Sequence, residues 1–236
     1  MPENLLIPSV DMRIGSLEEY NRRQNNKTEI QCRKPKPRPC ITISREYGCT
    51  GYPVAECLRK IMIQKTGDKW VLIDKAVLEE VALHNNFSED ILHSLGENHH
   101  ILDEILATFS PRWKSDQEYF RLLSRYVVAL AEQGNVIIVE LGGAIIARHI
   151  EHSSHFRIFG SDSFKTSTLA CRLNMEMKDA EILMHRQQKL CDHFTRIFLD
   201  QDDSAPALYD LLLNNDRCTA ENIAGTIASY VGIQFG

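Results

Sequence analysis

From residue 40 onward, short apolar runs alternate with stretches in which apolar residues recur every three or four positions. The runs predict five strands, at residues 41–44, 70–73, 136–139, 155–159 and 209–213. Residues 136–139 read Val-Ile-Ile-Val without a polar interruption, which suits a parallel strand covered on both faces. Strands that alternate with helices in this way predict an α/β fold with a five-stranded, parallel, doubly wound sheet.

Helical patterns fill the intervals between these strands. They predict helices at residues 53–65, 76–84, 117–132, 161–173 and 219–231, two shorter helices within 88–110, and a long helical stretch over 178–199 that is expected to divide into two. Ser161 is the expected N-cap of its helix, because its side-chain oxygen can accept a backbone N–H of the first turn.

The first 39 residues are expected to be an extension outside the folded domain, which then covers residues 40–236. Ser16 and Glu19 have the spacing of a helix capping box. Residues 33–39 are basic, and prolines at 35, 37 and 39 favour an extended linker. Such a segment can bind nucleic acid or lipid, but a solvated tether is its more common role.

Composition narrows the class of protein. With 43% hydrophobic and 25% charged residues, the chain resembles an ordinary globular protein, and its net charge of −5 gives no signal for nucleic acid or an anionic membrane. No apolar stretch is long enough to cross a bilayer, and the first residues lack the features of a secretory signal. Seven cysteines without a Cys-x-x-Cys pair indicate reduced thiols and a cytoplasmic location.

The stretch at residues 39–58 is the main candidate for a binding site. A β-branched run leads into a turn with Gly48 and Gly51 and then into a helical pattern. This order is typical of a phosphate-binding loop, in which backbone N–H groups and the helix N-terminus surround an anion. The strict motif G-x-x-x-x-G-K-[ST] is absent, since Tyr52 and Pro53 follow Gly51. By pattern alone, a tight turn without a ligand is an equal alternative.

Four segments of the chain resemble motifs of one known family. Residues 41–51 resemble I-T-I-S-R-[EQ]-[YF]-G-x-x-G, and residues 72–75 resemble a Y-D-K motif that follows the second strand. Residues 136–144 are similar to V-I-[IV]-G-R-G-[AG], and residues 208–217 to L-Y-D-L-x-L-N-x-[DS]-R. The family is the cytidylate-kinase-like branch of the P-loop nucleoside monophosphate kinases, and the resemblance extends from about residue 40 to about 230.

This resemblance implies a sheet of order 2-3-1-4-5, a helical monophosphate-binding insertion at about residues 84–130 and a lid at about 172–200. It also implies phosphoryl transfer from ATP, with Mg²⁺, to a nucleoside monophosphate, for which CMP or dCMP is the expected acceptor. Such a reaction needs aligned substrates and positive charge around the transferred group.

The resemblance also assigns site residues. Backbone N–H groups of the first motif would bind ATP phosphates, at Ser44, Gly48, Cys49, Thr50 and Gly51. Cations would surround the transferred phosphoryl group, at Arg45, Arg172, Arg186, Lys189 and Arg196. The acceptor nucleotide would contact Asp74, Arg121, Arg125, Gly142 and Gly143. Glu140 would hold Mg²⁺ through water.

Several of these residues have a second interpretation. Arg45 either replaces the missing loop lysine or forms a surface pair with Glu46. Glu140 is either a metal ligand or a substitution without functional effect at a position that the family fills with glycine. Asp74 either contacts the acceptor nucleotide or caps the helix that follows it. Cys49 lies at a helix N-terminus, which can lower a thiol pKa, but no general base accompanies it.

Three departures from the family pattern support a different class of function. The loop lysine is missing, Glu140-Leu141 replaces Gly-Arg after the third strand, and the lid segment has few arginines. Each lost cation weakens stabilisation of the transition state. The alternative is therefore a catalytically impaired nucleotide-binding or interaction module on a kinase fold.

Overall fold

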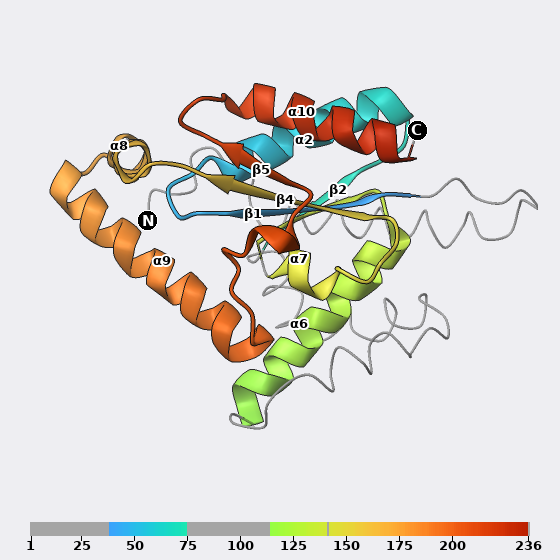
Figure 1. The fold of residues 1–236 in the computed structure, drawn as a ribbon, viewed down its shortest axis with the longest axis horizontal. Helices are drawn as coiled ribbons and strands as arrows, with labels where there is room; N and C mark the ends of the chain where they lie inside the picture. Colours follow the sequence, from blue (N-terminus) through green and yellow to red (C-terminus); the bar gives the residue numbers. More distant parts are fainter. Residues whose placement is uncertain (1–37, 75–113, 141, 236) are drawn as a thin grey trace, which may run out of the picture.

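Five parallel strands form one sheet in the order β2-β3-β1-β4-β5 (Figure 1). The computed structural model of the protein describes residues 38–74, 114–140 and 142–235. The strands are β1 (Cys40–Arg45), β2 (Val71–Ile73), β3 (Val136–Val139), β4 (Ser153–Phe159) and β5 (Leu211–Asn214). β1 is central and pairs in parallel with β3 on one side and β4 on the other. The predicted five-stranded parallel sheet and its order are confirmed.

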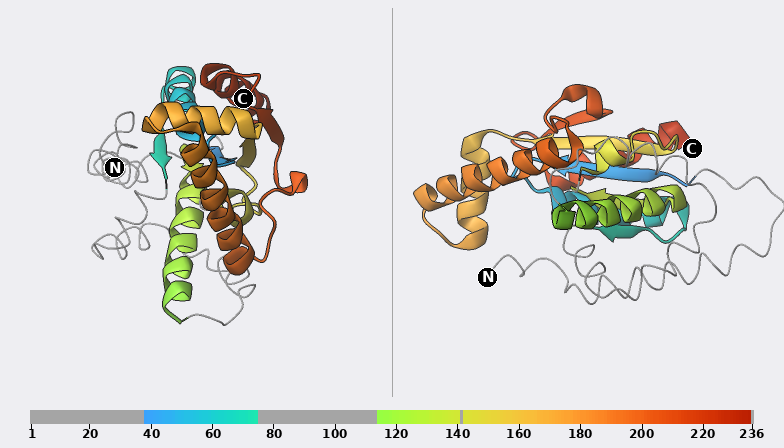
Figure 2. Two further views of the ribbon diagram at one scale, coloured as in Figure 1. Left: turned by 90° about the vertical axis from the view of Figure 1, so that its left-hand side faces the viewer. Right: turned by 90° about the horizontal axis from the view of Figure 1, so that it is seen from below.

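Helices cover both faces of this sheet (Figures 1 and 2). On one face lie α2 (Gly51–Thr66) and α10 (Ala220–Phe235), which pack against each other; on the other lie α6 (Lys114–Gln133) and the short α7 (Gly143–Ile146). Two further helices, α8 (Asp162–Leu173) and α9 (Met177–Leu199), pack together beyond the carboxyl ends of β1 and β4. A 3-10 turn, η2 (Pro206–Leu208), leads into β5.

Successive side chains of β1 point to opposite faces of the sheet and so contribute to a hydrophobic core on each face. Ile41 and Ile43 are fully buried with Phe156 in the core under α2 and α10. Cys40 is fully buried with Val136 in the opposite core, beside α6 and α7. Residues 40–44 are all buried, including the polar Thr42 and Ser44, as expected for a central parallel strand that is covered on both faces.

The observed elements differ from the predicted ones in detail. α9 is one continuous helix over Met177–Leu199, so the predicted division into two helices is wrong. β5 begins at Leu211, two residues later than predicted, because the Tyr209 N–H donates to the Pro206 carbonyl and closes the η2 turn. The sequence pattern missed α7, which at four residues is too short to show a helical period.

Some expectations lie outside the described residues. They are the capping box at Ser16, most of the basic linker, the helix at 76–84 and the pair within 88–110. Of the expected monophosphate-binding insertion, only residues 114–130 are described, as part of α6. Within the described ranges, no helix combines the length and the apolar character needed to span a membrane.

We predict that Phe156→Ala lowers the free energy of unfolding by about 3–5 kcal/mol, because it leaves a cavity in the core. Phe156 is fully buried, and its ring meets the ring of Tyr230 edge-on with centroids 5.6 Å apart. Urea denaturation followed by circular dichroism measures the change. Leu212→Ala, at a β5 position that is 43% exposed, serves as the control and should cost less than about 0.5 kcal/mol. Equal losses in both variants would contradict the assignment of this core.

Candidate functional site

The loop between β1 and α2, residues 46–50, lies at the carboxyl edge of the sheet. At its start the Glu46 N–H donates to the Ile158 carbonyl over 3.0 Å, and the turn closes where the Cys49 N–H donates to the Glu46 carbonyl over 3.0 Å. Ligands of open α/β sheets bind at this edge, where the loops after the strands meet. The β1–α2 loop is therefore the place to look for a site.

Two glycines, one in the loop and one at the start of α2, lie close against other side chains. Gly48 has a φ of +103°, and a Cβ there would lie 2.7 Å from the Cβ of Lys165 on α8. A Cβ on Gly51 would lie 2.7 Å from the Cδ of Arg45. The Arg45 side chain thus crosses the first residue of α2, at the positive end of that helix.

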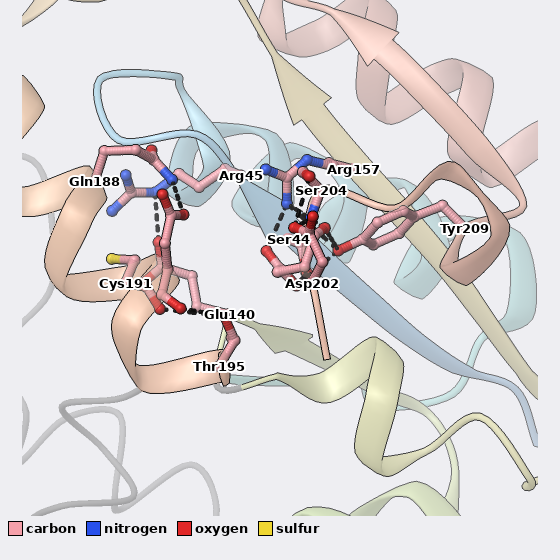
Figure 3. Close-up of polar contacts among 12 residues, drawn as sticks. Ser44, Arg45, Glu140, Arg157, Gln188, Cys191, Thr195, Asp202, Ser204 and Tyr209 are labelled. Atoms are coloured by element: carbon pink, nitrogen blue, oxygen red, sulfur yellow. Dashed lines mark hydrogen bonds and ion pairs between the residues drawn. The ribbon is translucent and has the colours of Figure 1, made fainter. Parts of the chain in front are cut away.

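Arg45 is held there by two neighbours. Its Nε lies 2.9 Å from Oε1 of Glu140, the residue directly after β3 (Figure 3). Its guanidinium carbon also lies 5.3 Å from the centre of the Tyr47 ring, within the range of a cation–π contact. The expected pairing of Arg45 with Glu46 is not what the structure shows, because Glu46 bonds to Lys165.

Two backbone N–H groups of the loop donate to side-chain amides. The Tyr47 N–H donates to Oε1 of Gln188 on α9 over 2.7 Å. The Thr50 N–H and hydroxyl both donate to Oδ1 of Asn215, over 2.8 and 2.9 Å. Asn215 follows β5, is only 4% exposed and donates to the Cys218 carbonyl over 3.1 Å. The side-chain amide oxygens of Gln188 and Asn215 thus accept backbone N–H groups that could otherwise donate to a phosphate oxygen.

A buried lysine supports the other side of the loop. Lys165 on α8 pairs with Glu46 at 2.8 Å and with Asp162 at 2.9 Å, and its side chain is 10% exposed. Burial alone would lower the pKa of Lys165, but its hydrogen bonds to the two carboxylates raise it. The lysine therefore stays charged and ties α8 to the β1–α2 loop.

A second polar cluster joins the end of β1 to the segment after α9 (Figure 3). Arg157 on β4 is 5% exposed and donates to the carboxylate and, over 2.8 Å, to the backbone oxygen of Asp203. The Tyr209 hydroxyl lies 2.7 Å from the same backbone oxygen and 2.7 Å from the carboxylate. The Ser44 hydroxyl donates to that carboxylate over 3.5 Å. Burial raises the pKa of Tyr209, so the phenol stays protonated.

Cys49 is not an activated thiol. It is 1% exposed, and burial raises its pKa to about 12, with the charge of Glu46 adding to the effect. The lowering that its position near a helix N-terminus suggested is overcome by desolvation. Its side chain contributes packing, since a Cβ on Gly160 would lie 3.4 Å from its sulfur.

The structure brings together only part of the predicted site. The β1–α2 loop, Arg45 and Glu140 are adjacent, while Gly142 and Gly143 are buried at the start of α7 and Asp74 directly follows β2. The remaining cations lie on helices: Arg172 on α8, Arg186, Lys189 and Arg196 on α9, and Arg121 and Arg125 on α6. Those on α8 and α9 are exposed, as is Arg121, and Arg125 is half-buried.

Loop geometry fits nucleotide phosphates on one condition. The glycine-lined turn, the start of α2 and the guanidinium of Arg45 together suit an anion, but the N–H groups of Tyr47, Cys49 and Thr50 would have to exchange their present acceptors for phosphate oxygens. For a metal ion, the described part of the chain has no group of three or more His, Cys, Asp or Glu side chains. Mg²⁺ needs only one or two carboxylates beside phosphates, but Glu140 is engaged by Arg45.

Sequence reasoning missed four residues around the loop: Lys165, Gln188, Asn215 and Arg157. Asn215 belongs to the motif at residues 208–217, and that motif was the available signal. Arg157 interrupts the apolar pattern of a predicted strand. A charged residue at such a position is expected to be buried and therefore paired with another polar group. No pattern in the sequence points to Lys165 or Gln188, whose roles depend on how α8 and α9 fold back.

Comparison with known proteins identifies the family of this chain. The sequence model of the cytidylate kinase-like family matches residues 40–217, well over half of the chain. The chain belongs to the cytidylate kinase-like family. The matched region runs from the first residue of β1 past the end of β5, so it covers the whole sheet and the β1–α2 loop. No curated protein matches the sequence.

Solved structures resemble this chain to different degrees. An uncharacterized protein from Eubacterium ventriosum ATCC 27560 superposes with a TM-score of 0.63 at 18% identity, over 83% of this chain and 99% of that one. A shikimate kinase from Bacteroides thetaiotaomicron gives 0.43 at 13% identity, over 82% and 98% of the two chains. A gluconokinase from Sinorhizobium meliloti 1021 gives 0.40 at 11% identity, over 86% and 100%. The last two TM-scores are too low to support a conclusion about this chain.

We predict that Gly48→Ala is more destabilising than Gly67→Ala. Both glycines have positive φ, at +103° and +71°, but a Cβ at Gly67 would meet nothing within 4 Å. Gly67→Ala should therefore cost only the left-handed backbone strain of about 1–2 kcal/mol. Gly48→Ala should cost about 1–3 kcal/mol more, because the methyl group collides with Lys165. Thermal or urea unfolding of the two variants tests the difference, and equal losses would refute the close packing of α8 on the loop.

We predict that Cys49 resists alkylation in the folded protein while exposed Cys171 and Cys191 react. With a pKa of about 12, only roughly 10⁻⁴ of the Cys49 thiol is ionised at pH 8, and thiolate is the reactive form. Iodoacetamide labelling followed by peptide mass spectrometry reports each site. Labelling in urea is the control, since all three should then react. Rapid labelling of Cys49 at pH 8 without urea would show that the loop is open.

Proposed function

We propose that the protein is an ATP-dependent kinase that transfers a phosphoryl group to a nucleoside monophosphate, with CMP or dCMP as the acceptor. Membership of the cytidylate kinase-like family supports kinase-type use of nucleotides in general. The observation that carries the proposal is the position of Arg45, whose side chain crosses Gly51 at the start of α2. A cation there supplies the positive charge that the loop lacks for want of a lysine.

In this proposal ATP and Mg²⁺, when bound, supply the phosphoryl group and neutralise its charge. The chain would hold the donor phosphates through backbone N–H groups at the end of β1, in the β1–α2 loop and at the start of α2: those of Ser44, Gly48, Cys49, Thr50 and Gly51. Arg45 contributes a guanidinium whose terminal nitrogens donate to phosphate oxygens. Glu140 is either a ligand of the metal through water or, as its 2.9 Å pair with Arg45 suggests, a support for that cation. Lys165 keeps the loop in place by its bond to Glu46.

The acceptor would lie at the carboxyl ends of β2 and β3. Asp74 follows β2, and Gly142 and Gly143 form the turn after β3, so the three are at one edge of the sheet. Arg121 and Arg125 on α6 would bind its phosphate. The exposed cations of the lid, Arg172, Arg186, Lys189 and Arg196, would surround the transferred group if the α8–α9 pair moves over the bound nucleotides.

A second candidate function is nucleotide binding without efficient catalysis. Three features favour it. Glu140 neutralises the charge of Arg45, and the Gln188 side chain accepts the hydrogen bond of the Tyr47 N–H. In addition, Leu141 is at the position where the family pattern has an arginine. A protein with these features can still bind phosphates through the loop. It would have fewer cations to stabilise the transition state.

A coupled ADP-release assay with MgATP and a panel of CMP, dCMP, UMP, AMP and GMP tests the proposal. We expect turnover with one pyrimidine monophosphate and a loss of about 10²- to 10³-fold in kcat for Arg45→Ala, as when one transition-state contact is removed. Arg59→Ala is the matched control, because Arg59 is also partly exposed and also forms a 2.9 Å ion pair, but on the outer part of α2.

Calorimetric titration with ATP separates the two functions. Binding of ATP with no turnover on any acceptor would favour the impaired module over the kinase. Absence of both binding and turnover, in protein shown to be folded, would refute nucleotide use altogether. Equal losses in Arg45→Ala and Arg59→Ala would refute the assigned role of Arg45.

A further inference from the structure

Glu140 has a backbone conformation that glutamate rarely adopts. Its φ is +66°, in the left-handed region that favours glycine. Among the described residues, four other than glycine have positive φ, and the other three are Asn135, Asn174 and Asp200. Asparagine and aspartate tolerate this region because their short side chains bond locally, whereas glutamate has no such advantage. Glu140 is therefore the exception that needs an explanation.

The surrounding chain imposes this conformation. The Glu140 N–H donates to the Ile43 carbonyl over 2.8 Å, and the Glu140 carbonyl accepts from the Gly143 N–H over 3.0 Å. The first bond continues the pairing of β3 with β1, and the second closes the turn into α7. Whatever residue occupies position 140 must adopt the left-handed conformation, and a glycine would do so without strain.

Stability alone does not favour glutamate at this position. The carboxylate gains an ion pair with Arg45, but the two side chains are 32% and 22% exposed. Pairs exposed to this degree contribute little to folding because water screens them. The ion pair at most offsets the backbone strain. Strain retained at a ligand-binding edge is a sign of a functional constraint.

The ion pair leaves Arg45 oriented for a ligand. Glu140 contacts the Nε of Arg45, and within the described ranges the two terminal nitrogens of the guanidinium remain available to another acceptor. The Tyr47 ring lies against the same guanidinium, and Gly51 leaves room for the side chain to cross the start of α2. Three contacts from three elements thus fix the direction of one cation.

We propose that Glu140 is a positioning residue, which holds Arg45 across the N-terminus of α2 so that its terminal nitrogens face a phosphate group of a bound nucleotide. This inference rests on the proposed nucleotide use of the β1–α2 loop. It gives Glu140 a role that acts through Arg45, in place of a direct contact with a metal ion. It also explains why a strained glutamate occupies a position where the family pattern has glycine.

A double-mutant cycle on ATP affinity tests this role. The dissociation constant for ATP is measured by calorimetry for the wild type, Glu140→Gly, Arg45→Ala and the double variant, each with Mg²⁺ and with EDTA. We expect Glu140→Gly to weaken ATP binding about tenfold, as for loss of one charge-assisted contact. Its melting temperature should be unchanged or higher by roughly 2–4 °C, because the backbone strain is relieved. A purely structural residue would lower the melting temperature and leave affinity unchanged.

The remaining variants isolate the mechanism. Glu140→Gly should have no further effect on affinity in the Arg45→Ala background, because the glutamate acts only through the arginine. Glu140→Gln retains an oxygen acceptor for Nε and should recover part of the affinity. Glu56→Gln is the matched control: it removes the charge from a 2.9 Å ion pair of similar exposure on α2 and should leave affinity unchanged.

Each other outcome overturns the inference in a distinct way. Wild-type affinity in Glu140→Gly would refute the positioning role while leaving the proposed nucleotide use intact. Additive losses in the double variant, seen with Mg²⁺ but absent with EDTA, would make Glu140 a metal ligand instead. Absence of ATP binding in the folded wild type would refute the proposed function and this inference together.

Discussion

The fixed position of β1 governs everything at the edge of the sheet. This strand is hydrogen-bonded to β3 and β4, and its residues are buried on both faces, so neither its register nor its end can shift. The β1–α2 loop therefore begins at a set place beside the ends of the two neighbouring strands. Glu140, Ser161 and Asn215 follow the ends of β3, β4 and β5 and lie along the same edge. The order of the strands in the sheet therefore determines which residues lie together at the candidate site.

Charge compensation is the second organising feature. Arg45, Lys165 and Arg157 lie near the end of β1, and each is paired with a carboxylate, from Glu140, Glu46 and Asp203. These pairs connect β1, β3, β4, α8 and the segment after α9. The pairs of Lys165 and Arg157 are the more buried ones, and buried pairs add little net stability but restrict the arrangements that the chain can adopt. Of the three cations, Arg45 is the most exposed and so is the one within reach of a ligand.

The sequence predicted the sheet well because apolar runs and helical periods are local signals. It predicted the β1–α2 loop for the same reason, since strand, glycine turn and helix follow one another directly. It could not predict Lys165 or Gln188, because their contacts with the loop depend on the path of α8 and α9. Nor did it predict that Arg45 pairs with Glu140, 95 residues away, in preference to its neighbour Glu46. Long-range pairing is set by topology and leaves no local pattern.

The bond from Thr50 to Asn215 has a consequence for how the chain acquires its structure during synthesis. The two residues are 165 positions apart, so the loop lacks one of its acceptors until β5 has been made and has joined the sheet. A ribosome-bound chain that already contains β1, β3 and β4 would still have an incomplete loop. Domains generally fold as units, and contacts of long sequence separation form late. The loop nearest the start of the described chain is thus among the last parts to become ordered, which delays ligand binding until the domain is nearly complete.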